Sequence, residues 1–178
     1  LKERSLDETV IKDFDLGLAL DKNYSLNKLL LNKNYAIETL LNLGLINRSG
    51  EYINDVFNNR IIFPIHDLDG NPIGFTGRIY EKNDQAKYIN SKESIIFKKG
   101  QILFNYHRAK NEIKRKKEII IVEGNMDAIR MYSSGVKNVV ALMGTSLTKD
   151  QVNIIKELRA KVILMFDNDN AGEIATIQ

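Results

Sequence analysis

Residues 118–129 read EIIIVEGNMDAI, and this stretch determines how the rest of the chain is interpreted. Ile119–Val122 is a continuous apolar run, which is typical of a strand buried on both faces of a parallel sheet. An acidic residue, Glu123, follows the run directly, and residues 126–134 are predicted to form a helix that ends near Gly135. The stretch therefore predicts the strand-to-helix step of an α/β domain, with a carboxylate at the carboxyl end of the strand.

The residues that follow repeat this step. Strands are predicted over 138–142 and 161–166, and the helix between them begins at Thr148, which forms a capping box with Gln151. Strands that alternate with helices form a parallel sheet, so we expect a sheet with helices on both faces and right-handed crossovers.

The first 117 residues have a different pattern. Residues 1–58 are predicted to be helical, beginning with a capping box at Ser5–Glu8. A β-hairpin, two short strands and a basic helix should follow, with Pro64 marking an edge strand; the predicted ranges are 61–65, 73–80, 88–90, 95–97 and 106–117. We expect an α+β basic subdomain over residues 1–117 and an α/β subdomain over residues 118–178.

Composition excludes several classes of site. The 178 residues contain no cysteine, which excludes disulfides, thiolate zinc sites and cysteine nucleophiles. No apolar run is long enough to cross a membrane. Because the chain opens at Leu1 rather than at a methionine, we expect a segment of a longer protein.

The net charge of +3 conceals an uneven distribution. Residues 78–117 hold twelve Lys and Arg against four Asp and Glu, a net charge of +8. A basic stretch of this kind indicates a polyanionic partner, although a solvated helix face would explain Lys114–Lys117 equally well.

Four carboxylates are expected at the carboxyl edge of the predicted sheet, where sites form in such folds. Glu123 follows one strand, and Asp167 and Asp169 follow another; Asp127 lies one helical turn beyond Glu123. Oxygen ligands favour Mg²⁺ or Mn²⁺ over zinc. The alternative is structural, because Asp169 or Asn170 would also serve as a helix cap.

Taken together, IIIVEGNMDAI (119–129), ALMGTS (141–146) and FDNDNAG (166–172) resemble the Toprim domain of bacterial DnaG-type DNA primases. The segments RIIFPIHDLDGNPIGFTGR (60–78) and KYINSKESIIFKKG (87–100) resemble the basic half of the primase RNA-polymerase core. This resemblance implies a Rossmann-like Toprim sheet over residues 118–178.

The resemblance also implies roles for individual residues. Glu123, Asp167 and Asp169 would be catalytic, and with Asp127 they would hold two or more Mg²⁺ or Mn²⁺ ions. Nucleotide and template contacts would come from nine further residues: Arg60, Arg78, Lys87, Tyr88, Asn90, Lys99, Gly144, Thr145 and Ser146. His66 and His107 have no partners at metal-ligand spacing and are interpreted as structural.

The activity implied is DNA-templated synthesis of short RNA primers by nucleotidyl transfer. The implied partners are a single-stranded DNA template, ribonucleoside triphosphates, the RNA–DNA hybrid product and a replicative helicase. The helicase-binding module and a zinc-binding module would both lie outside this chain. The implied location is the bacterial cytoplasm, at the nucleoid-associated replication fork.

Three other functions use part of the same pattern. A Toprim nuclease or topoisomerase shares the carboxylates, but residues 60–100 resemble neither. A phosphatase of the haloacid-dehalogenase type also has an Asp-x-Asp after an apolar strand, but that strand comes first in its domain and here it comes third. A non-catalytic single-strand-binding module would use the basic face alone.

Overall fold

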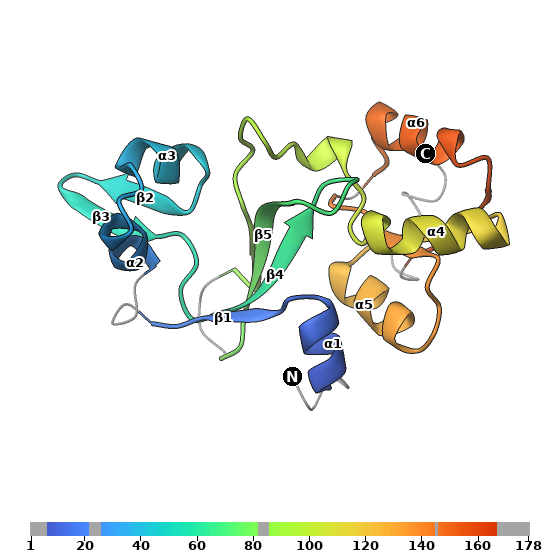
Figure 1. Ribbon diagram of the computed structural model, residues 1–178, viewed down its shortest axis with the longest axis horizontal. Helices are drawn as coiled ribbons and strands as arrows, with labels where there is room; N and C mark the ends of the chain where they lie inside the picture. Colours follow the sequence, from blue (N-terminus) through green and yellow to red (C-terminus); the bar gives the residue numbers. More distant parts are fainter. Residues whose placement is uncertain (1–6, 22–25, 82–85, 145, 167–178) are drawn as a thin grey trace. The chain divides into compact units, whose positions relative to one another are not determined.

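The computed structural model describes residues 7–21, 26–81, 86–144 and 146–166 (Figure 1). The chain divides into two compact units. We call residues 11–64 and 73–98 the N-terminal unit, and residues 1–10, 65–72 and 99–178 the C-terminal unit. The units divide the chain differently from a single boundary at residue 117, because residues 99–117 pack with the predicted Toprim sheet.

The elements of the first half of the chain, in order, are α1 (Glu8–Asp13), β1 (Gly17–Ala19), α2 (Leu26–Asn32), α3 (Ile37–Asn42), β2 (Ile46–Ser49), β3 (Tyr52–Asp55), β4 (Arg60–His66), β5 (Pro72–Ile79) and β6 (Tyr88–Asn90). In the described residues β1, β4, β5 and β6 form one sheet in that order, while β2 and β3 pair as a separate hairpin. The predicted hairpin and the strand at 88–90 are confirmed as β4, β5 and β6.

Several expectations for this half are wrong. Residues 1–58 are not all helical, because they include β1 and the β2–β3 hairpin. Residues 95–97 lie in a loop rather than in a strand. Ser5 lies outside the described residues, and the side chain of Asp7 caps α1 by accepting a hydrogen bond from the Val10 N–H at 2.9 Å.

The edge-strand interpretation of Pro64 is also wrong, because β4 lies between β1 and β5. β1 pairs with β4 only from Arg60 to Ile62. Pro64 lies beyond the end of that pairing, so its missing N–H removes no hydrogen bond to β1. The proline is tolerated in an inner strand because the neighbouring strand is short.

The second half of the chain contains η3 (Lys99–Gln101), α4 (Tyr106–Lys116), β7 (Glu118–Val122), α5 (Asn125–Ser133), β8 (Val139–Ala141), α6 (Lys149–Glu157) and β9 (Lys161–Met165). The predicted parallel sheet is confirmed: β7 lies between β8 and β9 and is parallel to both. The capping box of Thr148 and Gln151 at the start of α6 is confirmed as well.

An apolar core joins this sheet to its helices. Residues of α4, β7, β8 and α6 form one buried cluster: Leu103, Tyr106, Ala109, Ile113, Ile119, Ile121, Val140, Leu142, Ile155 and Leu158. β7 and β8 are almost wholly buried, as expected for strands covered on both faces. β9 differs, because Val162 and Met165 are 43% and 51% exposed, so coverage on both faces does not extend to this strand among the described residues.

Candidate active site

The carboxyl edge of the parallel sheet carries the acidic part of the site. Val122 pairs with Met165 of β9 and with Ala141 of β8, so the residues that follow the three strands meet at one edge. Glu123 is half-buried directly after β7. Asp167 and Asp169 lie outside the described residues, but the described part of β9 ends beside Val122, one residue before Phe166. The strands that precede Glu123 and Asp167 are therefore neighbours, which is the condition on which the expected acidic cluster depends.

The Asp127 side chain turns back toward Gly124, the residue after Glu123. It stands in the first turn of α5, whose N-cap is Gly124. A Cβ atom built on Gly124 would lie only 2.6 Å from the Oδ2 atom of Asp127, so the carboxylate lies over the Gly124 backbone. The absence of a side chain at residue 124 leaves this space to the carboxylate, one residue from Glu123.

Lys99 lies beside the loop that follows β8. A Cβ built on Gly144 would lie 3.9 Å from the Lys99 Cε atom. Gly144 and Ser146 are exposed, and Thr145 lies outside the described residues. The C-terminal unit thus brings a lysine to the same sheet edge that carries Glu123 and Asp127.

The segment that carries Lys99 is held by the start of α6. The Thr148 hydroxyl donates to the Gly100 carbonyl. The Gln151 side chain, 2% exposed, donates to the Ile102 carbonyl at 2.8 Å and accepts from the Thr148 N–H at 3.0 Å. The sequence predicted the Thr148–Gln151 cap but gave no signal for its second role, because Ile102 is 49 residues away from Gln151.

Replacing Gln151 with leucine should destabilise the protein by about 2 kcal/mol, because it leaves a buried carbonyl and a backbone N–H without their partner. The free energy of unfolding in urea measures this. Gln101→Leu is the matched control: its amide donates to Asp150 at 3.1 Å on the exposed surface, and its loss should cost less than about 0.5 kcal/mol. If both variants lost the same free energy of unfolding, the buried hydrogen bonds of Gln151 would not stabilise the protein more than the exposed one of Gln101.

In the N-terminal unit, one face of the β5–β6 pair carries three of the predicted residues, Arg78, Tyr88 and Asn90. Thr76 lies on the same face, opposite Asn90. Arg78 pairs with Tyr88 across the strands, and its guanidinium carbon lies 5.2 Å from the centre of the Tyr88 ring. The Thr76 hydroxyl donates to the Asn90 side chain at 2.7 Å. Arg78 is only 6% exposed, whereas the neighbouring Lys87 is exposed.

Arg60 lies on the opposite face of this sheet. A Cβ built on Gly77 would lie 2.9 Å from the Arg60 Cδ atom, and side chains alternate along a strand, so Arg60 and Arg78 point to different sides. Its guanidinium donates to the Gly77 and Ala86 carbonyls at 3.3 and 2.9 Å. Burial lowers the Arg60 pKa from its usual value. The structure thus separates Arg60 from Arg78, Tyr88 and Asn90.

The remaining predictions concern metals and histidines. Among the described residues, no group of three or more His, Asp or Glu side chains could hold a metal ion. The rings of His66 and His107 lie against each other with centres 4.5 Å apart and planes tilted by 46°, and the Arg108 guanidinium lies 2.7 Å from His107 Nε2. No helix in the described part is long and apolar enough to cross a membrane.

A pocket is also present within the N-terminal unit. It has a volume of about 620 Å³ and is lined mainly by apolar side chains, among them Leu18, Leu29, Phe57 and Ile62. Asp15, Lys28 and Asp55 also line this pocket, but none of the predicted site residues does, so the pocket does not define the active site.

Comparison with known proteins decides the family. Residues 1–110 match the family described as DNA primase catalytic core, N-terminal domain, and residues 117–178 match the Toprim domain. The chain belongs to the DnaG-type DNA primases. It is 38% identical over its whole length to the DNA primase of Staphylococcus aureus strain COL, of which it spans 30%.

Solved primase structures have the same fold. The zinc-binding and RNA polymerase domains of the Aquifex aeolicus primase superpose with a TM-score of 0.90 and 38% identity, covering 98% of this chain and 43% of that one. A DnaG primase catalytic domain bound to single-stranded DNA superposes with a TM-score of 0.87 and 32% identity, covering 99% of this chain and 55% of that one. The expected fold, an α+β basic part followed by a Toprim α/β part, is thereby confirmed.

Proposed function

We propose that this primase chain carries out DNA-templated synthesis of short RNA primers from ribonucleoside triphosphates during DNA replication. The observation that carries the proposal is the pairing of Val122 with Met165. It makes β7, which Glu123 follows, the parallel neighbour of β9, and this supports the proposal that Glu123, Asp167 and Asp169 act together. Lys99 adds a positive charge beside the loop at the carboxyl edge of this sheet.

The donor set fits a magnesium or manganese site, because the side chains that meet at the edge offer carboxylate oxygens. Glu123, Asp127, Asp167 and Asp169 would hold the cations, of which we propose two or more. When bound, two such ions activate the attacking 3′-hydroxyl and neutralise the leaving pyrophosphate. Among the described acids, Glu123 directly follows β7 and Asp127 stands in the first turn of α5, so regular elements position both side chains.

The nucleotide and template contacts are proposed for Arg78, Lys87, Tyr88, Asn90, Lys99 and the loop Gly144–Ser146. Arg78 and Tyr88 already form a cation–π pair, and base–aromatic stacking at an exposed tyrosine is a common way to hold single strands. Arg60 is proposed to support the sheet instead, since its guanidinium donates to two backbone carbonyls.

The proposed partners are a single-stranded template, ribonucleoside triphosphates and the RNA–DNA hybrid that forms. The solved catalytic domain bound to single-stranded DNA supports the first of these. We propose that a replicative helicase binds to a part of the primase outside these 178 residues. The zinc site is likewise proposed to lie outside them. The proposed place of action is the replication fork.

The test is primer synthesis on a single-stranded template with ribonucleoside triphosphates and Mg²⁺ or Mn²⁺, with the products resolved by length. Short RNA products that depend on template and metal support the proposal. Cleavage of the template would indicate a nuclease, and release of inorganic phosphate alone would indicate a phosphatase.

Lys99→Ala should lower this synthesis at least about tenfold, because a single charged contact to a phosphate is worth roughly 1.5–3 kcal/mol. Lys98→Ala is the matched control, since Lys98 is its exposed neighbour in the chain. Initial rates at varied triphosphate concentration measure the effect. Equal rates for Lys99→Ala and the unsubstituted protein would remove Lys99 from the site.

A further inference from the structure

A second basic surface lies at the other edge of the parallel sheet. The amino ends of β7, β8 and β9 lie there, and cationic residues stand shortly before each strand or at its first position. We define the amino-edge cluster as Lys114, Arg115, Lys116, Lys117, Lys137, Arg159 and Lys161. All of these side chains except the half-buried Lys137 are exposed. Three separate segments of the chain therefore contribute to one basic surface.

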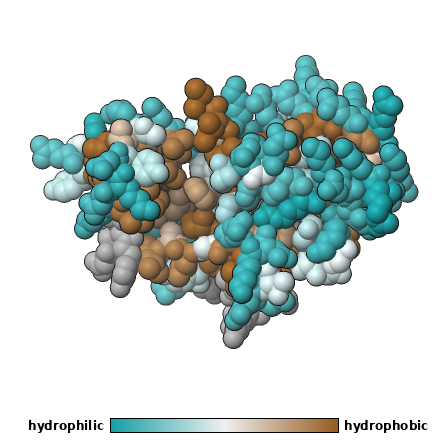
Figure 2. All heavy atoms as spheres, in the orientation of Figure 1, coloured by the Kyte–Doolittle hydropathy of each residue, from teal (hydrophilic) through white to brown (hydrophobic). Residues whose placement is uncertain are grey.

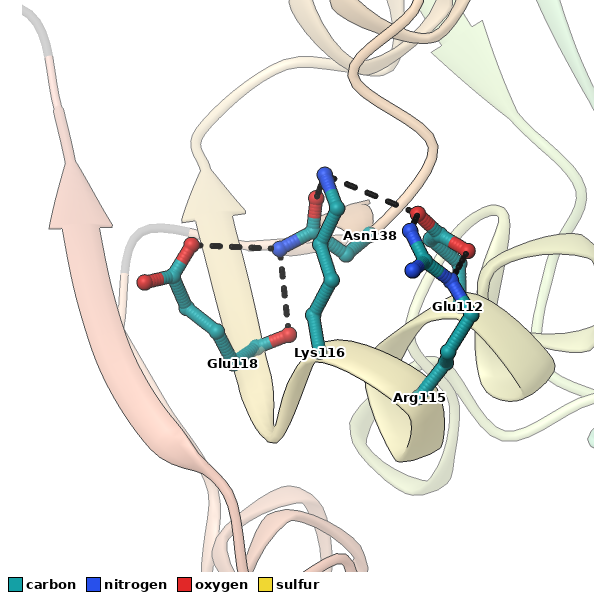
Figure 3. Close-up of polar contacts among 5 residues, drawn as sticks. All are labelled: Glu112, Arg115, Lys116, Glu118 and Asn138. Carbon is teal, nitrogen blue, oxygen red and sulfur yellow. Dashed lines mark hydrogen bonds and ion pairs between the residues drawn. The ribbon is translucent and has the colours of Figure 1, made fainter.

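Backbone and side-chain contacts fix these segments together. Glu118 pairs with Lys161 across β7 and β9, and the Lys161 N–H donates to the Lys117 carbonyl at 2.8 Å. Asn138, which is fully buried, donates to the Glu118 carbonyl at 3.1 Å and accepts from the Lys116 ammonium at 3.3 Å (Figure 3). The cations thus stand on a constrained scaffold rather than on a free loop.

Part of the charge is balanced locally. Arg115 donates twice to Glu112, at 2.8 and 2.6 Å, and Lys116 lies 3.6 Å from the same carboxylate (Figure 3). The hydrogen bond from Arg115 is the main reason that the Glu112 pKa falls to about 2, so this acid stays charged at neutral pH. Residues 112–118, 137 and 157–161 together contain the seven cations and three carboxylates, Glu112, Glu118 and Glu157, which leaves a net charge of +4.

Two of the cations occupy costly backbone positions. Lys117 and Arg159 have φ angles of 56° and 48°, in the left-handed region that costs a residue other than glycine about 1 kcal/mol. α5 ends differently, with Gly135 at φ 100°. A favourable interaction with the helix dipole would be available to a cation anywhere in the last turn, so it does not explain a cation at these two positions.

We propose that the amino-edge cluster binds the phosphate backbone of a nucleic acid strand. The strand starts and the last turn of α4 span about 15 Å, enough for roughly four phosphates of one strand. The cluster lies about 20 Å from Glu123, because six residues of extended chain separate Lys117 from that acid. In the view of Figure 2, hydrophilic residues predominate over α4, and a strip of hydrophobic residues lies near α6.

This surface is distinct from the catalytic edge. The sequence presented residues 78–117 as one basic tract, but the structure places Lys114–Lys117 at the amino edge of the sheet and Lys99 at the carboxyl edge. The inference rests on the proposed function only in taking nucleic acid, rather than another polyanion, as the ligand. A nucleic acid strand bound at both edges of the Toprim sheet would be restrained even without a further contact to the acidic residues of the carboxyl edge.

The test is a double substitution, Lys117→Gly with Arg159→Gly, which removes two charges at positions where glycine is favoured. The melting temperature should therefore stay the same or rise, so weaker binding cannot be attributed to unfolding. Affinity for a 20-nucleotide single-stranded DNA is measured against salt concentration. The slope of log K against log salt should fall by about 1.4, or 0.7 for each lost phosphate contact.

The matched control is Lys28→Gln with Lys33→Gln, which changes the net charge equally at two exposed lysines, one in α2 and one directly after it. Its slope should not change. An unchanged slope in the glycine variant, or an equal fall in the control, overturns the proposal and leaves an acidic protein as the alternative ligand. Primer synthesis is measured separately, so a reduced slope in an inactive protein would still support the amino-edge cluster while refuting the proposed function.

Discussion

Replacing Glu123 with glutamine is expected to reduce metal-dependent primer synthesis by at least about a hundredfold. The substitution keeps the size of the side chain but removes a negative charge where cations must be held, and ligand charge sets the affinity of such oxygen sites. Loss of one electrostatic group in an active site commonly costs a factor of 10² to 10³ in rate. Rates at saturating triphosphate, together with Mn²⁺ binding by titration, measure the effect.

Glu118→Gln provides the control for this result. Glu118 stands at the other end of the same strand and is also half-buried, but it faces the amino edge of the sheet. Its substitution should leave Mn²⁺ binding unchanged. If Glu123→Gln binds Mn²⁺ as tightly as the unsubstituted protein does, the assignment of Glu123 as a metal ligand is wrong.

The parallel sheet was predictable because its strands are apolar runs, and β7 and β8 are each followed by a helix with a clear start or stop signal. The capping box at Thr148 and the glycine at residue 135 marked helix ends that the structure confirms. Patterns of this kind involve only residues that lie close together in the sequence, so they can be recognised without the structure.

The hairpin of β2 and β3 was missed because its strands are short and polar. Only Ile46 and Asp55 are fully buried in it, so the alternation that marks a half-buried strand is weak. The sequence nevertheless contained a signal, because a Ser-Gly pair such as Ser49-Gly50 often marks a turn. In the structure Gly50 lies in the turn between the two strands with φ 61°.

The remaining features that the sequence did not predict depend on contacts between segments that are far apart in the chain. The sequence grouped Arg60 with Arg78 as a nucleotide or template contact, but only the strand register shows that the two side chains lie on opposite faces of the sheet. Likewise, the basic tract could not be divided between two edges until α4 was seen to end at the start of β7. Both outcomes depend on register and topology, which no local pattern specifies.

The second large effect is expected at Gly77, in the strand that carries Arg78. A Cβ at this position would lie 2.6 Å from Phe57 Cδ1 and 2.9 Å from Arg60 Cδ. Phe57 is 7% exposed and packs edge-on against Phe75, with ring centres 6.1 Å apart, so it has little room to move. Gly77→Ala should therefore destabilise the protein by about 3 kcal/mol, the upper range for an overpacked core.

Gly17→Ala is the matched control, because it is also a strand glycine of this sheet and a Cβ there would meet nothing within 4 Å. Its free energy of unfolding should stay the same or rise by up to about 1 kcal/mol, since alanine restricts the unfolded chain. Urea unfolding of both variants measures the difference. A Gly77→Ala variant as stable as Gly17→Ala would mean that the Phe57 ring yields, and that Arg60 and Phe57 do not fix the position of the strand behind Arg78.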